Sequence, residues 1–345
     1  MKRACLTALG KIELLDIPEP PEPAPDEVLV RIRSCGICGS DALCYKTGRI
    51  GNYDCEYPQA MGHQAAGEVD EAGARSGFSS GDRVAIEPLR PCGQCEQCEQ
   101  GHFSLCPQAQ RLGGLGLPGA MQKRMIVKAK HLVHITEDIS FDEASLLEPL
   151  GVAYHSLVHL ANIQEGDTLA VFGAGPIGLL CAQLAKRCGA SAVLLSDPLE
   201  FRLDFAMNSI GADAVFNPTR DDVPHEVLEF TERRGVDIAI DAAGVQQSVD
   251  HAIESAALGA RVLLIGIPAV DKLSYNPHAM RRKQLSVFSA RGANQTLESC
   301  VELVSEQDFS MKGYVTNKYS LESAAQGFKD AASIIPGLIK AVINP

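Results

Sequence analysis

The chain has 345 residues, of which 46% are hydrophobic and 21% charged, and its formal net charge is −12. This composition is typical of a globular protein of about two domains, and the acidic balance argues against nucleic acid as a partner, because binding phosphates requires a basic face. The sequence shows neither a run of the roughly 18–20 apolar residues that a membrane span needs nor a signal peptide. We therefore expect a cytoplasmic protein that does not bind a membrane.

The first 150 residues are rich in Gly, Pro and Cys and contain short β-branched runs. Three of these runs, each bounded by turn residues, predict strands at Val28–Ile32, Ala66–Val69 and Arg83–Ile86. The stretch Leu112–Gly119 carries four glycines and predicts a loop. Because disulfides are rare in the cytoplasm, we expect the twelve cysteines to be metal ligands and buried thiols.

From Thr168 the chain alternates apolar runs with helix-length periodic segments, and this βαβ series predicts a parallel, doubly wound sheet. We expect strands at Leu169–Phe172, Ala192–Ser196, Ala214–Phe216, Asp237–Asp241 and Arg261–Ile265. We expect helices at Ile177–Cys188, Leu199–Ile210 and Ser248–Leu258. After about residue 290 the pattern loses this regularity.

A glycine motif lies between the first of these strands and the first helix. Gly173, Gly175 and Gly178 have the G-x-G-x-x-G spacing, which permits a tight turn, close approach of a pyrophosphate and close packing of helix on strand. Asp197 stands at the end of the next strand, where a carboxylate binds the adenosine ribose and repels a 2′-phosphate. NAD is thus favoured over NADP, although the nearby Arg202 weakens this preference. The candidate cofactor residues here are Gly173, Gly175, Pro176, Ile177, Gly178, Asp197 and Arg202.

Four cysteines lie close together in residues 92–106, at positions 92, 95, 98 and 106. Four thiolates at this spacing predict a tetrahedral zinc site, and a site with four protein ligands has no open position for a substrate. The sequence therefore predicts a structural zinc held by Cys92, Cys95, Cys98 and Cys106. Two disulfides or an iron–sulfur cluster are the alternatives, and the first conflicts with the expected compartment.

Three further segments contain candidate ligands that no spacing rule connects: Cys38 in Cys-Gly-Ser-Asp, His63 in Gly-His-Gln-Ala-Ala-Gly-Glu-Val, and Glu148 in Glu-Pro. With the four-cysteine and glycine segments, they stand in the order and at the separations of the zinc-containing medium-chain dehydrogenase/reductase family. The chain resembles this family over essentially its full length. Its Glu-Pro pair is more similar to the polyol (sorbitol-type) and threonine dehydrogenase branch than to simple alcohol dehydrogenases, which place a cysteine there.

The resemblance implies a particular domain organisation. Residues 1–150 and 290–345 are expected to form a chaperonin-10-like β-barrel catalytic domain that carries the zinc lobe at 92–106. Residues 151–289 are expected to form a Rossmann dinucleotide-binding domain inserted into it. The family also implies NAD and two zinc ions per chain, together with a homotetramer or homodimer.

The resemblance also implies a second, catalytic zinc. Cys38 and His63 match direct ligands, and Glu148 binds directly or through water, which leaves an open position for substrate. The family usually has Glu after the zinc histidine, whereas this chain has Gln64, whose amide oxygen is a possible ligand without a charge. The metal acts as a Lewis acid on the alcohol, and hydride then passes to the nicotinamide.

The remaining carried-over residues serve proton transfer and cofactor binding. Ser40 matches the hydroxyl that relays the alcohol proton, Asp41 an acceptor that fixes the metal histidine, and Arg291 an arginine near the nicotinamide. The chain departs from many relatives at Leu43, where they have a proton-relaying histidine, and at Cys44, where sorbitol enzymes have an aromatic residue.

Together these features predict a zinc-dependent oxidoreductase that transfers a hydride from a secondary alcohol of a polyol- or sugar-like substrate to NAD and gives a ketone. A threonine dehydrogenase or a dehydrogenase of phosphorylated polyols is the alternative within the family. A non-catalytic dinucleotide-binding protein is the alternative outside the enzymes.

Overall fold

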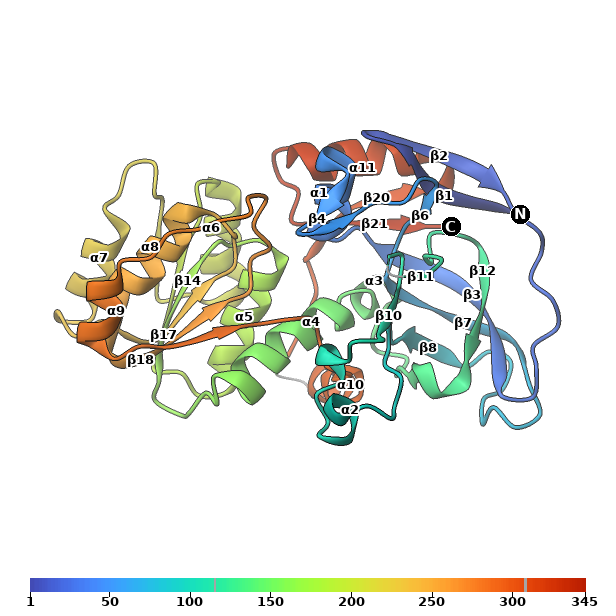
Figure 1. The fold of residues 1–345 in the computed structure, drawn as a ribbon, viewed down its shortest axis with the longest axis horizontal. Helices are drawn as coiled ribbons and strands as arrows, with labels where there is room; N and C mark the ends of the chain where they lie inside the picture. The colour runs from blue at the N-terminus through green and yellow to red at the C-terminus, as the bar shows by residue number, and fades with distance from the viewer. Residues whose placement is uncertain (115, 307–308) are drawn as a thin grey trace. The chain divides into compact units, whose positions relative to one another are not determined.

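The computed structural model describes residues 1–114, 116–306 and 309–345, and the chain divides into two compact units. The first unit comprises Met1–Glu148 and Asn294–Pro345, so both ends of the chain belong to it, and the second comprises Pro149–Ala293. Figure 1 shows the N-terminal blue and the C-terminal red segments in the same unit. Within the described part of the chain, no helix is long and apolar enough to cross a membrane.

The first unit is built around a seven-stranded sheet in which strands from both ends of the chain meet. Its order is β13-β8-β7-β3-β21-β20, and β12 also pairs with β3. The three strands expected from the sequence are confirmed as parts of β3, β7 and β8. The seven strands are β3 (Glu27–Gly36), β7 (Gln64–Ala72), β8 (Arg83–Ile86), β12 (Arg124–Lys128), β13 (Leu132–His134), β20 (Val315–Ser320) and β21 (Lys340–Asn344).

Smaller sheets and short helices complete this unit. The other strands are β1 (Lys2–Ala8), β2 (Lys11–Asp16), β4 (Arg49–Ile50), β5 (Tyr53–Asp54), β6 (Gln59–Ala60), β9 (Leu89–Arg90), β10 (Gln110–Leu112) and β11 (Gly116–Leu117). The helices are α1 (Gly39–Thr47), α2 (Glu96–Glu99), α3 (Phe141–Ala144), α10 (Leu297–Ser305) and α11 (Ala324–Ser333). The glycine stretch expected as a loop contains the two-residue strand β11, and its residue 115 lies outside the described residues.

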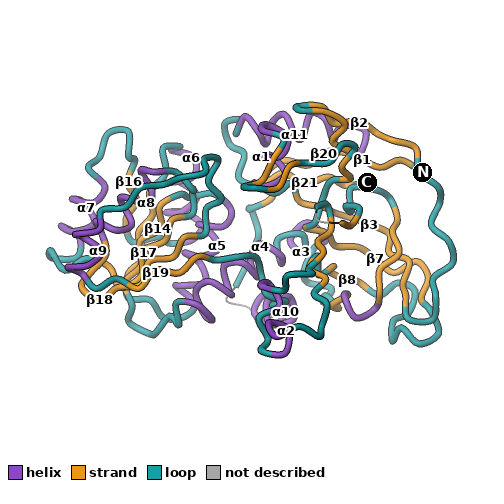
Figure 2. The backbone as a smooth tube through the Cα atoms, in the orientation of Figure 1, coloured by secondary structure: helices purple, strands orange, loops and turns teal. Residues whose placement is uncertain are grey.

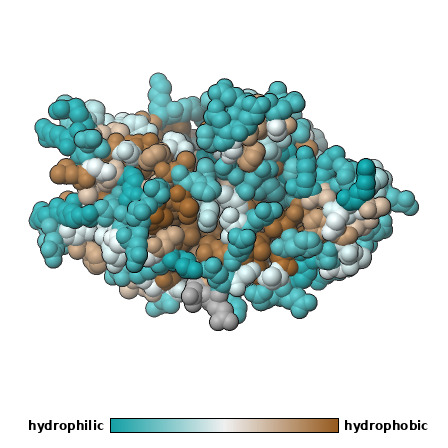
Figure 3. Space-filling view, turned by 90° about the horizontal axis from the view of Figure 1, so that it is seen from below, coloured by the Kyte–Doolittle hydropathy of each residue, from teal (hydrophilic) through white to brown (hydrophobic). Residues whose placement is uncertain are grey.

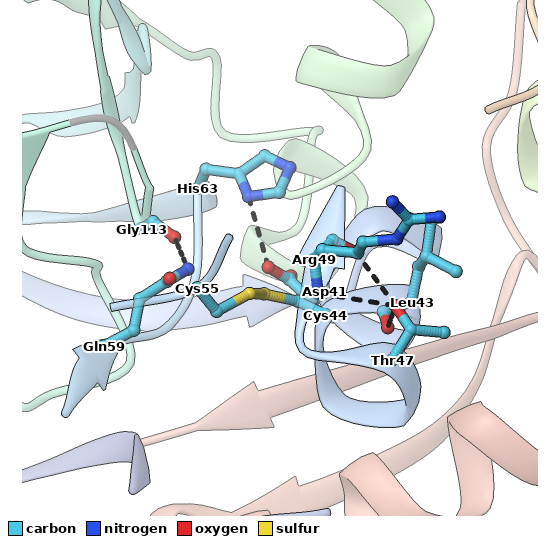
Figure 4. Close-up of a disulfide and its surroundings, with 9 residues drawn as sticks. All are labelled: Asp41, Leu43, Cys44, Thr47, Arg49, Cys55, Gln59, His63 and Gly113. Carbon is cyan, nitrogen blue, oxygen red and sulfur yellow. Dashed lines mark hydrogen bonds and ion pairs between the residues drawn. A yellow bond between two sulfur atoms is a disulfide. The ribbon is translucent and has the colours of Figure 1, made fainter. Parts of the chain in front are cut away.

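One disulfide corrects the expectation that all cysteines are ligands or free thiols. Cys44, in the last turn of α1, is bonded to Cys55, which follows β5. The β4–β5 hairpin turns the chain back toward α1, and the Cys55 N–H donates to the carbonyl of Gly48 at 2.7 Å. The two Cα atoms consequently lie 6.5 Å apart, which is within the range for a disulfide. Figure 4 shows this bond beside Asp41 on the same helix.

The second unit is the expected doubly wound domain, with a six-stranded parallel sheet in the order β16-β15-β14-β17-β18-β19. The strands are β14 (Thr168–Phe172), β15 (Ala192–Ser196), β16 (Ala214–Phe216), β17 (Val236–Asp241), β18 (Ala256–Leu264) and β19 (Ser286–Ser289). Helix α4 (Leu147–Tyr154) begins in the first unit and continues as a π-helix over His155–Leu160, and α6 (Glu200–Phe205) continues as a π-helix over Ala206–Ile210. The other helices are α5 (Pro176–Arg187), α7 (Val223–Phe230), α8 (Gln246–Ser255) and α9 (Pro277–Lys283).

The order of the strands along the chain reverses at β14, and this reversal determines on which face of the sheet each helix lies. The chain moves from β14 to β15 on one side and from β17 to β18 on the other. Because such crossovers are right-handed, α5 and α8 cover opposite faces of the sheet. Figure 2 shows the orange strands of this unit between purple helices. Ligands of this fold bind at the carboxyl ends of the strands beside the reversal point.

One expected helix end is wrong. The sequence predicts a helix over Ser248–Leu258, but α8 ends at Ser255 and β18 begins at Ala256. Ala256 is buried and pairs with Val236 of the neighbouring strand. Burial in the sheet thus overrides the helical propensity of the alanines.

Candidate functional site

The glycine turn after β14 has the geometry that a dinucleotide requires. Gly173 has a φ of +112°, and a Cβ added to it would lie 2.9 Å from the backbone nitrogen of Ala243. A Cβ added to Gly178 would lie 1.9 Å from the carbonyl oxygen of Gly173, so α5 packs directly on the turn. The atom nearest to a Cβ added at Gly175 is Arg202 Nη1, at 3.9 Å. The turn is therefore open at Gly175, where a pyrophosphate fits.

Helix α5 begins directly behind this turn. Its N-cap is Gly175, and Pro176 and Ile177 form the start of its first turn. Proline is favoured there because its missing N–H has no partner within the helix. The other N–H groups of a first turn have no partner within the helix, so the start of α5 favours an anion.

Asp197 ties the end of β15 to the glycine turn. Its side chain is 3% exposed, and Oδ2 accepts the Ala174 N–H at 2.9 Å and Arg202 Nη1 at 3.2 Å. Oδ1 accepts the Leu199 N–H at 3.0 Å. Asp197 and Arg202, both expected near the cofactor, therefore form a part-buried ion pair beside the turn.

Two further residues lie at the carboxyl ends of parallel strands, at the same edge of the sheet as the glycine turn. Asp241 ends β17, and its Oδ1 accepts the N–H groups of Ala243 and Gly244 at 3.0 and 2.8 Å. This carboxylate shapes the turn that borders Gly173. Arg291 is exposed and follows β19 by two residues.

The four cysteines of residues 92–106 form a cluster of the right size for one metal ion. Their sulfur atoms all lie within 4.8 Å of one another, and Cys95 Sγ is 3.5 Å and Cys92 Sγ 4.0 Å from Cys98 Sγ. A tetrahedron with Zn–S bonds of about 2.3 Å has sulfur atoms about 3.8 Å apart. The Gln94 N–H lowers the pKa of Cys92 to about 7, which favours its thiolate. A zinc ion fits this cluster, as the spacing predicts.

Cys38 and His63 come together through the start of α1. Cys38 is the N-cap, and its N–H donates to Asp41 Oδ2 at 2.9 Å. Asp41 Oδ1 lies 3.5 Å from His63 Nδ1, an ion pair that Figure 4 shows as a dashed line. One buried carboxylate thus fixes both the backbone of Cys38 and the ring of His63.

The Cys38 thiol and the His63 ring shift each other's protonation. Burial disfavours the imidazolium, but the charges of Asp41 and Cys38 outweigh burial and hold the pKa of His63 well above its ordinary value. Burial likewise disfavours the Cys38 thiolate, but the charge of His63 and a hydrogen bond from it bring the pKa of Cys38 below its ordinary value. A thiolate beside an imidazole is a donor pair that suits zinc.

Glu148 and Gln64 form a second hydrogen-bonded pair in the candidate site. Gln64 Nε2 donates to Glu148 Oε2 at 2.9 Å, and Arg111 Nη1 lies 3.6 Å from Glu148 Oε1. Lys340 Nζ donates to Gln64 Oε1. Burial lowers the pKa of Lys340, and the nearby charges of Cys38 and Glu148 oppose that effect.

The expected catalytic ligands are not all within reach of one ion in this arrangement. Among the described residues, only the four-cysteine cluster brings three or more His, Cys, Asp or Glu ligand atoms within 4.8 Å of one another. Cys38 is hydrogen-bonded to His63, whereas Glu148 binds Gln64. Ser40 is half-buried in the first turn of α1, two residues beyond Cys38.

Comparison with known proteins identifies the family. A model described as an alcohol dehydrogenase GroES-like domain matches residues 24–137, and one described as a zinc-binding dehydrogenase matches residues 176–306. The two matches cover more than half of the chain. The chain belongs to the zinc-binding alcohol dehydrogenase family. It is an enzyme of the zinc-dependent, nicotinamide-linked dehydrogenases, and its fold of a GroES-like unit with a Rossmann unit is confirmed.

Relatives within the zinc-binding dehydrogenases align over nearly the whole chain. A sorbitol dehydrogenase of Bacillus subtilis is 32% identical over 97% of this chain and 94% of its own length. A D-xylulose reductase of Saccharomyces cerevisiae is 31% identical over 97% of this chain and 95% of its own. The crystal structure of galactitol-1-phosphate dehydrogenase from Escherichia coli superposes with a TM-score of 0.89 at 29% identity, covering all of both chains. The polyol branch of the family, expected from the Glu-Pro pair, is thus confirmed.

Sequence reasoning missed two charged residues of this dehydrogenase site. Lys340 is 3% exposed within the apolar strand β21, and a lone charge in such a strand is a signal that was available. Arg111 lies in β10 without a comparable signal, because its strand contains other polar residues.

Proposed function

We propose that this zinc-dependent dehydrogenase oxidises a secondary alcohol of a polyol- or sugar-like substrate to a ketone and reduces NAD. The observation that carries the proposal is the Cys38–His63 donor pair held by Asp41, because a thiolate and an imidazole fixed side by side form the core of an open zinc site. The relatives named sorbitol dehydrogenase and D-xylulose reductase support the substrate class.

In this proposal Cys38, His63 and Glu148 hold the catalytic zinc. A bound zinc would supply Lewis acidity, which lowers the pKa of the alcohol. Asp41 faces Nδ1 of His63, so the ring is oriented with Nε2 available as the ligand atom. Because the ligand atoms of Cys38, His63 and Glu148 do not all lie within 4.8 Å of one another, Glu148 reaches the ion through a water molecule, or directly after its side chain has moved.

Proton transfer in this proposal begins at Ser40. Its hydroxyl stands in the first turn of α1, two residues beyond Cys38, where it takes the proton that the substrate alcohol releases. Leu43 follows on the same helix and carries no titratable group. Solvent therefore takes the proton from Ser40 without the histidine that many relatives use.

NAD is the proposed cofactor, bound by the glycine turn and Asp197, with Arg291 near the nicotinamide. The buried carboxylate of Asp197 faces the turn and disfavours a 2′-phosphate by repulsion. Arg202 neutralises part of this charge. We therefore propose a preference for NAD rather than exclusion of NADP.

A homo-oligomer formed through the nucleotide unit is also proposed. Strand β19 stands at the end of the sheet order, so its outer backbone groups have no partner within the described sheet. Several large hydrophobic side chains of this unit are exposed, including Leu258 at 81% and Val287 of β19 at 38%. Figure 3 shows brown, hydrophobic residues on this unit at the left of the view. A second copy that pairs along β19 covers both features.

The cytoplasm is the proposed compartment. Ten cysteines are free thiols, and four of them form the metal cluster, which requires reduced sulfur. The Cys44–Cys55 disulfide is the exception to this pattern.

A substrate panel tests the proposed reaction. NADH formation is measured with polyols, sugars, phosphorylated polyols and hydroxy-amino acids such as threonine, with and without a zinc chelator. We expect the highest kcat/KM with an unphosphorylated polyol and loss of that activity on chelation. Highest activity with threonine or a phosphorylated polyol contradicts the substrate class, and no activity in zinc-loaded protein favours a non-catalytic dinucleotide-binding protein.

A further inference from the structure

Lys340 is a buried cation whose contacts lead into the proposed zinc site. It is the first residue of β21 and is 3% exposed. Its Nζ donates to the carbonyl oxygen of Ile37, the residue before Cys38, at 2.9 Å, and also to Gln64 Oε1. The ammonium group therefore bridges the backbone directly before one proposed ligand, Cys38, and the side chain that follows another, His63.

These contacts determine which way the Gln64 amide points. A lysine ammonium has three donors and no acceptor, so the amide atom that faces Lys340 is the oxygen. The nitrogen then faces Glu148 and donates to Oε2 at 2.9 Å. An ionised carboxylate only accepts hydrogen bonds, so both ends of the amide are correctly matched. The hydrogen bonds from Lys340 to Gln64 and from Gln64 to Glu148 thus run in one direction, from the cation to the anion, which gives this network a single polarity.

The identity of residue 64 follows from this polarity. A neutral amide presents an acceptor to Lys340 and a donor to Glu148 at the same time. A glutamate at position 64 would still accept from Lys340, but it would place a second carboxylate against Glu148, and like charges so close repel each other. Glutamine is therefore the side chain that connects this cation to this anion.

The backbone leaves space for this arrangement at Gly36. A Cβ added there would lie 2.8 Å from Gln64 Oε1 and 2.9 Å from Lys340 Cε. Gly36 is paired with Gln64 of β7 on one side and with Val342 of β21 on the other. The sheet thus brings Lys340 and Gln64 together across a glycine, and this observation is independent of the hydrogen bonds.

We propose that Lys340 is a positioning residue that fixes the Gln64 amide, so that its nitrogen orients Glu148 for the metal and its oxygen stays with the lysine instead of binding the ion. This inference rests on the proposed function, because it assumes a catalytic zinc at Cys38, His63 and Glu148. It assigns the direct or water-bridged ligand role to Glu148 and excludes Gln64 from it.

The affinity of the Cys38–His63 site for zinc distinguishes a positioning role of Lys340 from an effect of its charge alone, because the two predict changes of opposite sign in this affinity. A cation that acts only by its charge repels zinc, so Lys340→Met would then bind zinc more tightly. If Lys340 positions Gln64 and Glu148, the same change weakens zinc binding, by about 10- to 100-fold as for other residues that orient metal ligands. Lys340→Arg keeps the charge and the donors and should recover most of the affinity.

The experiment is competition of the full-length protein with a chelator of known affinity, with the zinc of the four-cysteine cluster serving as an internal reference. Lys318→Met is the matched control, because Lys318 lies in the adjacent strand β20 and pairs with Asp142. Gly36→Ala is the second variant: it alters no charge, yet its methyl group displaces Gln64 Oε1 and the lysine. Thermal unfolding verifies that each variant is folded.

Weaker zinc binding in Lys340→Met and Gly36→Ala, with Lys318→Met unchanged, supports the proposal. Unchanged or tighter binding in a folded Lys340→Met or Gly36→Ala overturns it and leaves the proposed function intact. A wild-type protein without any zinc that depends on Cys38 overturns the proposed function, and this inference with it.

Discussion

The carboxylate of Asp197 accepts the backbone N–H of Ala174 at 2.9 Å, so the residue that directly follows the second strand of the nucleotide sheet also fixes the centre of the glycine turn. Asp197 therefore has two functions in one place. It shapes the turn that receives the pyrophosphate, and it presents a negative charge where the adenosine ribose is expected.

Replacing this carboxylate should change the preference between the two dinucleotides. Asp197→Ala removes the repulsion of a 2′-phosphate and frees Arg202 to bind it. We expect the ratio of kcat/KM for NADP to that for NAD to rise by about tenfold or more, which corresponds to about 1.4 kcal/mol. Asp213→Ala is the control, because Asp213 also accepts a backbone N–H in this unit. An unchanged ratio in Asp197→Ala would show that Asp197 does not select the cofactor.

The four-cysteine cluster should contribute to stability rather than to chemistry. Cys95→Ser removes one ligand from a closed site, and we expect a loss of about 4 kcal/mol or more in the free energy of unfolding together with the zinc of this cluster. Urea unfolding and metal analysis measure the two effects. Cys188→Ser, at the end of α5, is the control and should change neither. Retention of full stability by a protein that has lost this zinc is the result that contradicts a structural role.

His131 should make the protein sensitive to acid. It is buried, and its Nδ1 has no hydrogen-bond partner among the residues that the structure describes; burial, reinforced by the charge of Arg90, lowers its pKa to about 3. Between this value and the ordinary pKa of about 6.5 the unfolded chain binds more protons than the folded one, so stability falls as the pH falls through that range.

The free energy of unfolding should fall by about 1.4 kcal/mol for each pH unit between about 6.5 and the His131 pKa of about 3. Urea unfolding at a series of pH values measures it, and His131→Gln should flatten the curve relative to wild type. His225→Gln is the control because His225 is half exposed on α7. Parallel curves for wild type and His131→Gln would assign the acid sensitivity to other groups.

The Cys44–Cys55 bond gives a countable prediction. The chain has twelve cysteines, of which two form this bond and ten are free. Thiol titration of the denatured protein with a chelator and without reductant should therefore find ten thiols, and twelve after reduction. Twelve thiols before reduction would mean that Cys44 and Cys55 are free in the isolated protein.

The sequence was most informative where local patterns decide the structure. The strands β15 and β16 begin and end at the predicted residues, because each is a mainly apolar run with turn residues on both sides, fully buried in β15 and half-buried in β16. The end of α8 was predicted wrongly, since the alanines that follow it favour a helix locally but are buried in a sheet. The Cys44–Cys55 bond was missed because it depends on a hairpin between two short strands.

The candidate site likewise combines features that local sequence patterns predict with features that depend on contacts between distant residues. The glycines of the turn lie close together in sequence, and so do the four cysteines, so the spacing within each motif predicts its geometry. Lys340 and Gln64 are 276 residues apart and meet only because both ends of the chain contribute strands beside β3. No spacing rule describes such a contact, and Lys340 could have been suspected only as a charge in an apolar strand.

Zinc content together with NADH formation in Cys38→Ser shows whether the chain holds a catalytic zinc distinct from the one in its four-cysteine cluster. We expect about two zinc ions per wild-type chain, and about one, with no polyol oxidation, in a folded Cys38→Ser. A Cys38→Ser protein that keeps its full zinc content and its activity would show that Cys38 does not hold a catalytic zinc.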